Sequence, residues 1–188
     1  KLVTMVQPEE FDFSDNFPAI ISNVFPDNLE SGYFIFNFTV QERFVYVLRF
    51  PGDGTEYSLM FMTKYSYHTL FYSFLESIKN AIISGVDSLS TNNLFTYCFT
   101  VLKSWVFLNK NMLNVVFYDT EFDVDISPNT ETRLNHNPLA YINDEKSVWE
   151  SIISGERVCV TGNDPILVSK CASSLSFFTY PFIFKGKI

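Results

Sequence analysis

The chain has 188 residues, of which 47% are hydrophobic and 18% aromatic, and it carries a formal net charge of −8 at pH 7. This composition can bury a sizeable core and excludes an intrinsically disordered chain. The excess of carboxylates argues against a nucleic-acid partner, because binding phosphates requires clustered Lys and Arg, and it suits a basic or mixed protein partner. No apolar run reaches the roughly 20 residues that span a bilayer. We expect one domain, or one domain and part of another, without a transmembrane segment.

The first 31 residues form the least regular part of the sequence. Three prolines, Pro8, Pro18 and Pro26, interrupt any long helix. The apolar run at residues 19–25 is interpreted as a short edge strand. A loop at residues 26–32 is expected to lead into the first regular strand.

The next part of the chain predicts a meander of three β-strands. Its three runs are rich in aromatic and β-branched residues, which strands favour; they are residues 33–40, 44–50 and 57–63. The links between the runs are short. The second link, Pro51-Gly52-Asp53-Gly54, combines a fixed φ with residues that tolerate positive φ, as tight turns require.

After the strands, the apolar spacing changes to that of a helix over about residues 67–84. Its apolar positions are Leu70, Phe71, Phe74, Leu75, Ile78 and Ile82. Gly85 stands where a helix commonly ends. We expect the helix to cover one face of the antiparallel meander, with Phe71, Phe74, Leu75 and Ile78 buried. The predicted fold class is therefore α+β.

A second helix is predicted to begin near Thr91 or Asn92, either of which can cap it. Its apolar side is formed by Leu94, Phe95, Cys98, Val101, Leu102 and Trp105, a pattern typical of core packing. The three cysteines, Cys98, Cys159 and Cys171, form no Cys-x-x-Cys pair, so we expect buried free thiols in a reducing compartment. Asn37-Phe38-Thr39 matches a glycosylation sequon, but Asn37 falls inside a predicted strand and we discount it.

Four carboxylates alternate with other residues in the run Leu113–Ile126; they are Asp119, Glu121, Asp123 and Asp125. If the run is a strand, its period of two places all four on one face. Such a face must meet water, a basic protein surface or a cation. Asp123-Val124-Asp125 also matches the short Asp-x-Asp motif of some metal-dependent sugar transferases. We expect a solvated strand without a metal.

Residues 127–142 have the composition of a linker, and the pattern after them changes. Asn143 or Asp144 can cap a helix that carries Val148, Trp149, Ile152 and Ile153. Residues 157–161 are interpreted as a buried strand, followed by a helix with Asp164 as N-cap and Pro165 at its first position. With a further strand near residues 181–184, this order predicts the start of an α/β lobe.

The sequence carries no recognisable catalytic constellation. His68 and His136 are the only histidines and belong to no metal-binding motif, and there is no P-loop, Gly-x-Ser-x-Gly or Gly-x-Gly-x-x-Gly. We therefore expect no catalytic residue, no metal and no cofactor. The chain is interpreted as an interaction protein.

Two separated segments resemble the DENN-domain family. Phe25-Pro26-Asp27 before the meander, and the strand-to-helix segment Tyr57–Phe71, are similar to its upstream part. The segment Val148–Val160, which contains Trp149-Glu150 and Gly155-Glu156, is similar to the start of its central region, with Asp164-Pro165 and Tyr180-Pro181-Phe182 following in the same order. The chain departs from the family pattern at Ser66, where many members carry proline, and it lacks the family's downstream Arg-Pro-Tyr-rich continuation.

The resemblance implies a longin-type lobe over residues 1–126, a linker over 127–142, and the truncated start of the central DENN α/β lobe over 143–188. It also implies a guanine-nucleotide exchange factor that binds a Rab small GTPase in membrane traffic. Exchange of this kind uses binding energy to hold the switch segments of the GTPase in a conformation that releases GDP. A cytoplasmic protein recruited to endosomal or Golgi-derived membranes would follow.

The alternative implied by the same resemblance is a longin or DENN-like scaffold, or a subunit of a GTPase-regulatory complex, that pairs with another longin module. A GTPase-activating role would require an exposed arginine finger, for which the longin segment offers Arg43 and Arg49.

A partner surface is predicted on the helix after the meander. Tyr65, His68, Tyr72 and Glu76 recur every three or four residues and would form one stripe, offset from the apolar stripe. Tyr is common at interfaces because it buries area and keeps a polar tip. The competing interpretation is that these residues pack under a neighbouring loop or the second lobe.

Overall fold

The computed structural model describes residues 17–25, 30–41, 43–65, 67–85, 91–105, 112–126 and 142–175. These residues form helices with one three-stranded and one two-stranded antiparallel sheet, which confirms the α+β class. In chain order the elements are α1 (Phe17–Val24), β1 (Phe34–Val40), β2 (Arg43–Gly52), β3 (Thr55–Thr63), α2 (His68–Ile83), α3 (Thr91–Ser104), β4 (Met112–Phe117), β5 (Thr120–Asp125), α4 (Glu145–Ile153) and α5 (Pro165–Ser174). Among the described residues, no helix is both long enough and apolar enough to cross a bilayer.

The three-stranded sheet confirms the predicted meander. Its strand order is β1-β2-β3, and both neighbouring pairs are antiparallel. The two residues between β2 and β3, Asp53 and Gly54, have φ angles of 48° and 73°. Positive φ at both central residues suits the right-handed twist of paired strands, which is why Asp-Gly favours a tight hairpin here.

The central strand β2 separates two apolar clusters. Tyr46, Leu48 and Phe50 belong to the larger cluster, which includes α2, whereas Val45 and Val47 pack with Ile20 and Val24 of α1. Successive side chains of a strand point to opposite faces, so this alternation follows directly from the sequence of β2. Both faces of the sheet are therefore covered.

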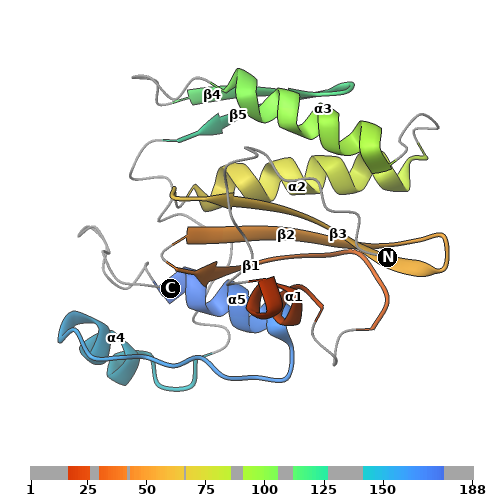
Figure 1. Cartoon of the computed structure of the whole chain (residues 1–188). Helices are drawn as coiled ribbons and strands as arrows, with labels where there is room; N and C mark the ends of the chain where they lie inside the picture. The colour runs from red at the N-terminus through yellow and green to blue at the C-terminus, as the bar shows by residue number, and fades with distance from the viewer. Residues whose placement is uncertain are drawn as a thin grey trace.

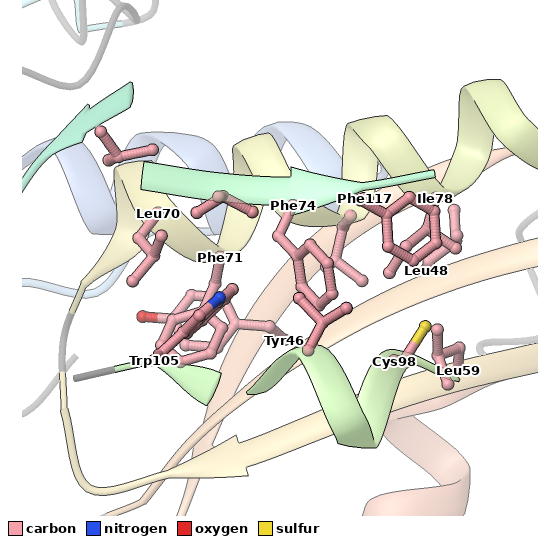
Figure 2. Close-up of a cluster of buried hydrophobic side chains, with 14 of the residues drawn as sticks. Tyr46, Leu48, Leu59, Leu70, Phe71, Phe74, Ile78, Cys98, Trp105 and Phe117 are labelled. Carbon is pink, nitrogen blue, oxygen red and sulfur yellow. The ribbon is translucent and has the colours of Figure 1, made fainter. Parts of the chain in front are cut away.

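Helix α2 lies between the three-stranded sheet and the β4–β5 hairpin (Figure 1). Phe74, at its middle, is fully buried, and its ring centroid lies 5.5 Å from that of Phe61 in β3, 5.1 Å from Trp105 and 5.4 Å from Phe117 in β4. Figure 2 shows Phe74, Trp105 and Phe117 within this cluster of buried side chains. The predicted burial of Phe71, Phe74, Leu75 and Ile78 is confirmed. Helix α3 closes the same cluster with Leu94, Cys98 and Val101.

The apolar run at residues 19–25 is not an edge strand, and that prediction is wrong. It belongs to helix α1, in which Ile20 and Val24 are buried. Residues four positions apart lie on one face of a helix, so Ile20 and Val24 together pack α1 against Val45 and Val47 of the sheet. Pro18 is tolerated because it lies in the first turn, where its missing N–H has no partner within the helix.

The run Leu113–Ile126 is a hairpin and not one strand. Tyr118 and Asp119 form the turn, so Asp119 does not join the other carboxylates on a strand face. Glu121, Asp123 and Asp125 do share one face of β5, as the period of two predicts.

The buried strand predicted at residues 157–161 is also wrong. These residues have no regular secondary structure, and Arg157, Cys159 and Thr161 are exposed. A strand needs a partner for its backbone groups, and the described part of the chain offers none here. The expectation of buried thiols therefore holds for Cys98 and Cys171 but not for Cys159. The further strand near residues 181–184 lies outside the described residues.

The two C-terminal helices begin where the sequence predicts. The Asp144 side chain accepts from the Ser147 amide, and Asp164 accepts from the Ile166 and Leu167 amides, with Pro165 at the first position of α5. α4 buries no residue and leaves Trp149 and Ile153 exposed. α5 packs against β1, the edge strand of the sheet (Figure 1).

Candidate partner-binding site

Tyr65 and Glu76 are the exposed members of the predicted surface stripe. Tyr65 precedes α2, is 59% exposed, and stacks on the ring of Tyr67 at a centroid distance of 5.8 Å. Glu76 lies at the middle of α2, where it forms an ion pair with Lys79 one turn further on. Both side chains reach solvent, so both are available to a partner.

His68, in contrast, belongs to the core. It is the first residue of α2 and is only 4% exposed, with Nδ1 3.0 Å from the hydroxyl oxygen of Tyr46. The ring of Phe44 meets it edge-on at 5.4 Å. Burial removes the imidazolium from water and lowers the pKa of His68 to about 4. The side chain is therefore neutral at pH 7 and supports the sheet–helix contact.

Tyr72 also points inward, and its hydroxyl donates to Oδ1 of Asn37 in β1 at 2.8 Å. Burial raises the pKa of Tyr72 to about 12, against a smaller lowering by its hydrogen bond with Ser169. The four residues thus do not form one surface stripe, because His68 and Tyr72 pack against the sheet. For these two, the structure agrees with the packing interpretation.

Asn37, Tyr72 and Ser169 form a polar cluster, here called the Asn37 cluster, that joins β1, α2 and α5. Ser169 Oγ of α5 lies 3.0 Å from the backbone nitrogen of Asn37 and 2.7 Å from its backbone carbonyl oxygen. It also lies 2.9 Å from the side-chain Oδ1 of Asn37. A hydroxyl can accept from the N–H while donating its one proton to an oxygen. Ser169 therefore satisfies backbone groups on the outer edge of β1, where none of the described strands pairs.

This cluster was not predicted from the sequence. Asn37 stands between Phe36 and Phe38 in an otherwise apolar run, and a lone amide in a buried strand requires hydrogen-bond partners. That pattern could have marked Asn37 as structurally constrained. Its burial also agrees with discounting the glycosylation sequon.

Replacing Ser169 with Ala is expected to lower the free energy of unfolding by about 1–3 kcal/mol, because it removes the hydrogen bonds between Ser169 and buried groups of Asn37. The measurement is urea unfolding followed by circular dichroism. Ser151→Ala is the matched control, since Ser151 bonds to Glu156 at an exposed site and its loss should cost much less. Equal losses of unfolding free energy in the two variants would show that the Asn37 cluster contributes no more to stability than an exposed hydrogen bond.

The acidic strand has a polar bridge but no metal-binding geometry. Asn114 Nδ2 of β4 donates to Glu121 Oε1 at 2.9 Å and to Asp123 Oδ1 at 3.0 Å. In the described ranges, no group of three or more His, Cys, Asp or Glu residues is arranged to hold a metal ion.

Comparison of the chain with protein-family models, with curated proteins and with solved structures found no match in any of the three.

Proposed function

We propose that the chain is part of a DENN-type guanine-nucleotide exchange factor that binds a Rab GTPase and promotes GDP release in membrane traffic. The proposal starts from the resemblance of Tyr57–Phe71 and Val148–Val160, with Asp164-Pro165, to the family's upstream and central segments. In this proposal the protein is cytoplasmic and reaches its membrane through its partners.

The contact of α5 with β1 is the observation that carries the proposal. α5 begins at Pro165, directly after the second resembling segment, and Ser169 binds Asn37 in the sheet to which the first segment contributes β3. The Asn37 cluster then connects both to α2 through Tyr72. An exchange factor that works by binding energy must hold its contact elements in a fixed relation, because looseness would reduce the energy available to deform the GTPase. The direct contact between residues 1–126 and 143–188, the two predicted lobes, supports this requirement.

The proposed exchange is tested by measuring release of a fluorescent GDP analogue from a panel of purified Rab GTPases, with the complete protein added in catalytic amounts. We expect accelerated release from at least one Rab and no acceleration from a non-Rab small GTPase. No acceleration across the panel would overturn the exchange-factor proposal.

The exposed residues Tyr65 and Glu76 are the proposed Rab contacts of this chain. Replacing both with Ala should slow Rab nucleotide release without lowering the melting temperature, because neither side chain is buried. The matched control is Tyr33→Ala with Glu30→Ala, which removes the same two residue types from an exposed position before β1. Unchanged release in the first variant, or equal slowing in both, would place the Rab contact elsewhere.

The alternative is a scaffold or regulatory subunit without exchange activity. Arg49 does not suit an arginine finger in this conformation, because it is buried and its Nε lies 3.1 Å from Glu56 Oε2. A scaffold would bind its partner stably and leave nucleotide release unchanged, so the kinetic experiment separates the two functions.

A further inference from the structure

The β4–β5 hairpin has one buried face and one open face. Leu113, Val115 and Phe117 of β4 point into the core formed with α2 and α3 and are almost completely buried. Met112 and Val116, on the opposite face of the same strand, are 49% and 50% exposed. The hairpin therefore presents two large apolar side chains to solvent, whereas the three-stranded sheet is covered on both faces.

The open face is also strongly acidic. In the register of the hairpin, Asp125 stands opposite Met112, Asp123 opposite Asn114, and Glu121 opposite Val116. Residues 112–126 contain no Lys or Arg. Carboxylates at alternate positions of one strand are roughly 7 Å apart and repel one another. The amide of Asn114 bridges two of them but contributes no positive charge.

This face is here called the acidic hairpin face and is defined by Met112, Asn114, Val116, Glu121, Asp123 and Asp125. Its negative charge limits which partners can cover it. A second copy docked face to face would bring carboxylates against carboxylates. Anionic lipid and nucleic acid are repelled for the same reason. A partner segment with Lys or Arg removes the repulsion, and apolar side chains beside those cations can cover Met112 and Val116.

We propose that the acidic hairpin face is a docking surface for an extended basic segment of a partner protein, in which apolar side chains alternate with Lys or Arg. The segment lies along the seam between β4 and β5, so that its apolar side chains project to one side and contact Met112 and Val116 of β4. Its cations project to the other side and lie against Glu121 and Asp123 of β5. Surface ion pairs contribute little each, so the apolar contacts stabilise the complex while the charges select the partner and speed its association. This surface lies on a different element from Tyr65 and Glu76, and the proposal does not depend on Rab binding.

The probe is a fluorescent synthetic peptide of alternating Lys and Val, titrated with the protein at physiological ionic strength and followed by anisotropy. We expect saturable binding, with weaker binding of a peptide that has Glu in place of Lys and of one that has Ser in place of Val. Equal binding of the three peptides would overturn the proposal.

The decisive variant is Glu121→Gln with Asp123→Asn. Both retain an oxygen that can accept from Asn114, so the hairpin should keep its fold, as thermal unfolding will verify. The Lys–Val peptide should bind about fivefold more weakly, the factor expected for two surface ion pairs. Asp53→Asn with Glu145→Gln removes the same charge at exposed positions far along the chain and should leave the affinity unchanged. An equal loss in both variants would show non-specific attraction to an acidic protein and would overturn the proposal.

A second variant tests the apolar contacts without changing charge. Met112→Ser with Val116→Ser should weaken binding of the Lys–Val peptide and leave binding of the Lys–Ser peptide unchanged. If affinity for the Lys–Val peptide does not fall, the apolar pair is not part of a docking surface and the proposal fails.

Discussion

Replacing Phe74 with Ala is expected to lower the free energy of unfolding by about 3–5 kcal/mol, the usual cost of deleting a buried phenyl ring. Phe74 is fully buried and contacts rings from the three-stranded sheet, the segment after α3, and the hairpin. Because Trp105, Phe117 and the sheet residues around Phe74 are themselves packed in the same buried cluster, the cavity cannot close easily. Urea unfolding followed by circular dichroism gives the change.

Phe99→Ala is the control for this variant. Phe99 lies on α3, is half-buried, and has the Lys103 ammonium 4.4 Å from its ring centroid. Its removal should cost clearly less than the removal of Phe74. Losses of similar size would show that the sheet, α2 and the hairpin do not share one core.

Acidification should destabilise the protein through His68. The folded-state pKa of His68 is about 4, below the ordinary value of 6.5, so the unfolded chain binds the proton more readily between these values. His68 therefore has no effect above pH 6.5. Below it, stability falls with pH, and the loss is complete near pH 4, where it reaches about 3 kcal/mol.

The measurement is the free energy of unfolding at several pH values between 7 and 4, for the wild type and for His68→Gln. Carboxylates titrate in the same range in both proteins, so the difference in slope isolates the histidine. The variant should be less stable at pH 7, because the contact with Tyr46 is altered, but it should lose less on acidification. Parallel pH profiles would contradict a buried neutral His68.

The three-stranded sheet and α2 could be predicted from the sequence because local and long-range requirements agree there. β1, β2 and β3 are rich in strand-forming residues, Asp53-Gly54 suits the tight turn between two of them, and the apolar spacing of α2 matches the face it buries. The helix caps Asp144 and Asp164 could also be predicted, because a capping side chain bonds only to backbone amides in the first turn of its own helix.

The hairpin turn at Tyr118 illustrates what the sequence does not reveal. Tyr118 has a φ of 50°, a conformation that non-glycine residues seldom adopt. Its ring packs at 4.4 Å from that of Tyr97 on α3, and the Tyr97 hydroxyl accepts from its backbone N–H at 3.2 Å. A partner outside the hairpin thus stabilises the turn, and no local Asn-Gly or Asp-Gly pattern marks it.

The candidate site was less predictable than the fold for the same reason. Helical spacing placed His68 and Tyr72 beside Tyr65 and Glu76, but spacing alone does not say how wide the buried side of a helix is. α2 packs against the sheet on one side and the hairpin on the other, so its buried surface is wider than one stripe. The bond from Ser169 to Asn37 spans 132 positions of sequence, and no local pattern predicts such a pair.

Because α5 covers the edge strand β1, the solubility of a shortened protein depends on whether α5 is retained. β1, with the sequence Phe-Ile-Phe-Asn-Phe-Thr-Val, is aromatic, β-branched and uncharged, which is the composition of segments that add to one another in aggregates. An edge strand of this kind resists aggregation only while another part of the protein covers its unpaired backbone groups. Removal of the chain from residue 165 onward, by cloning or by a protease, would expose that edge. The shorter product should be recovered as insoluble material even though the meander and α2 are complete in it.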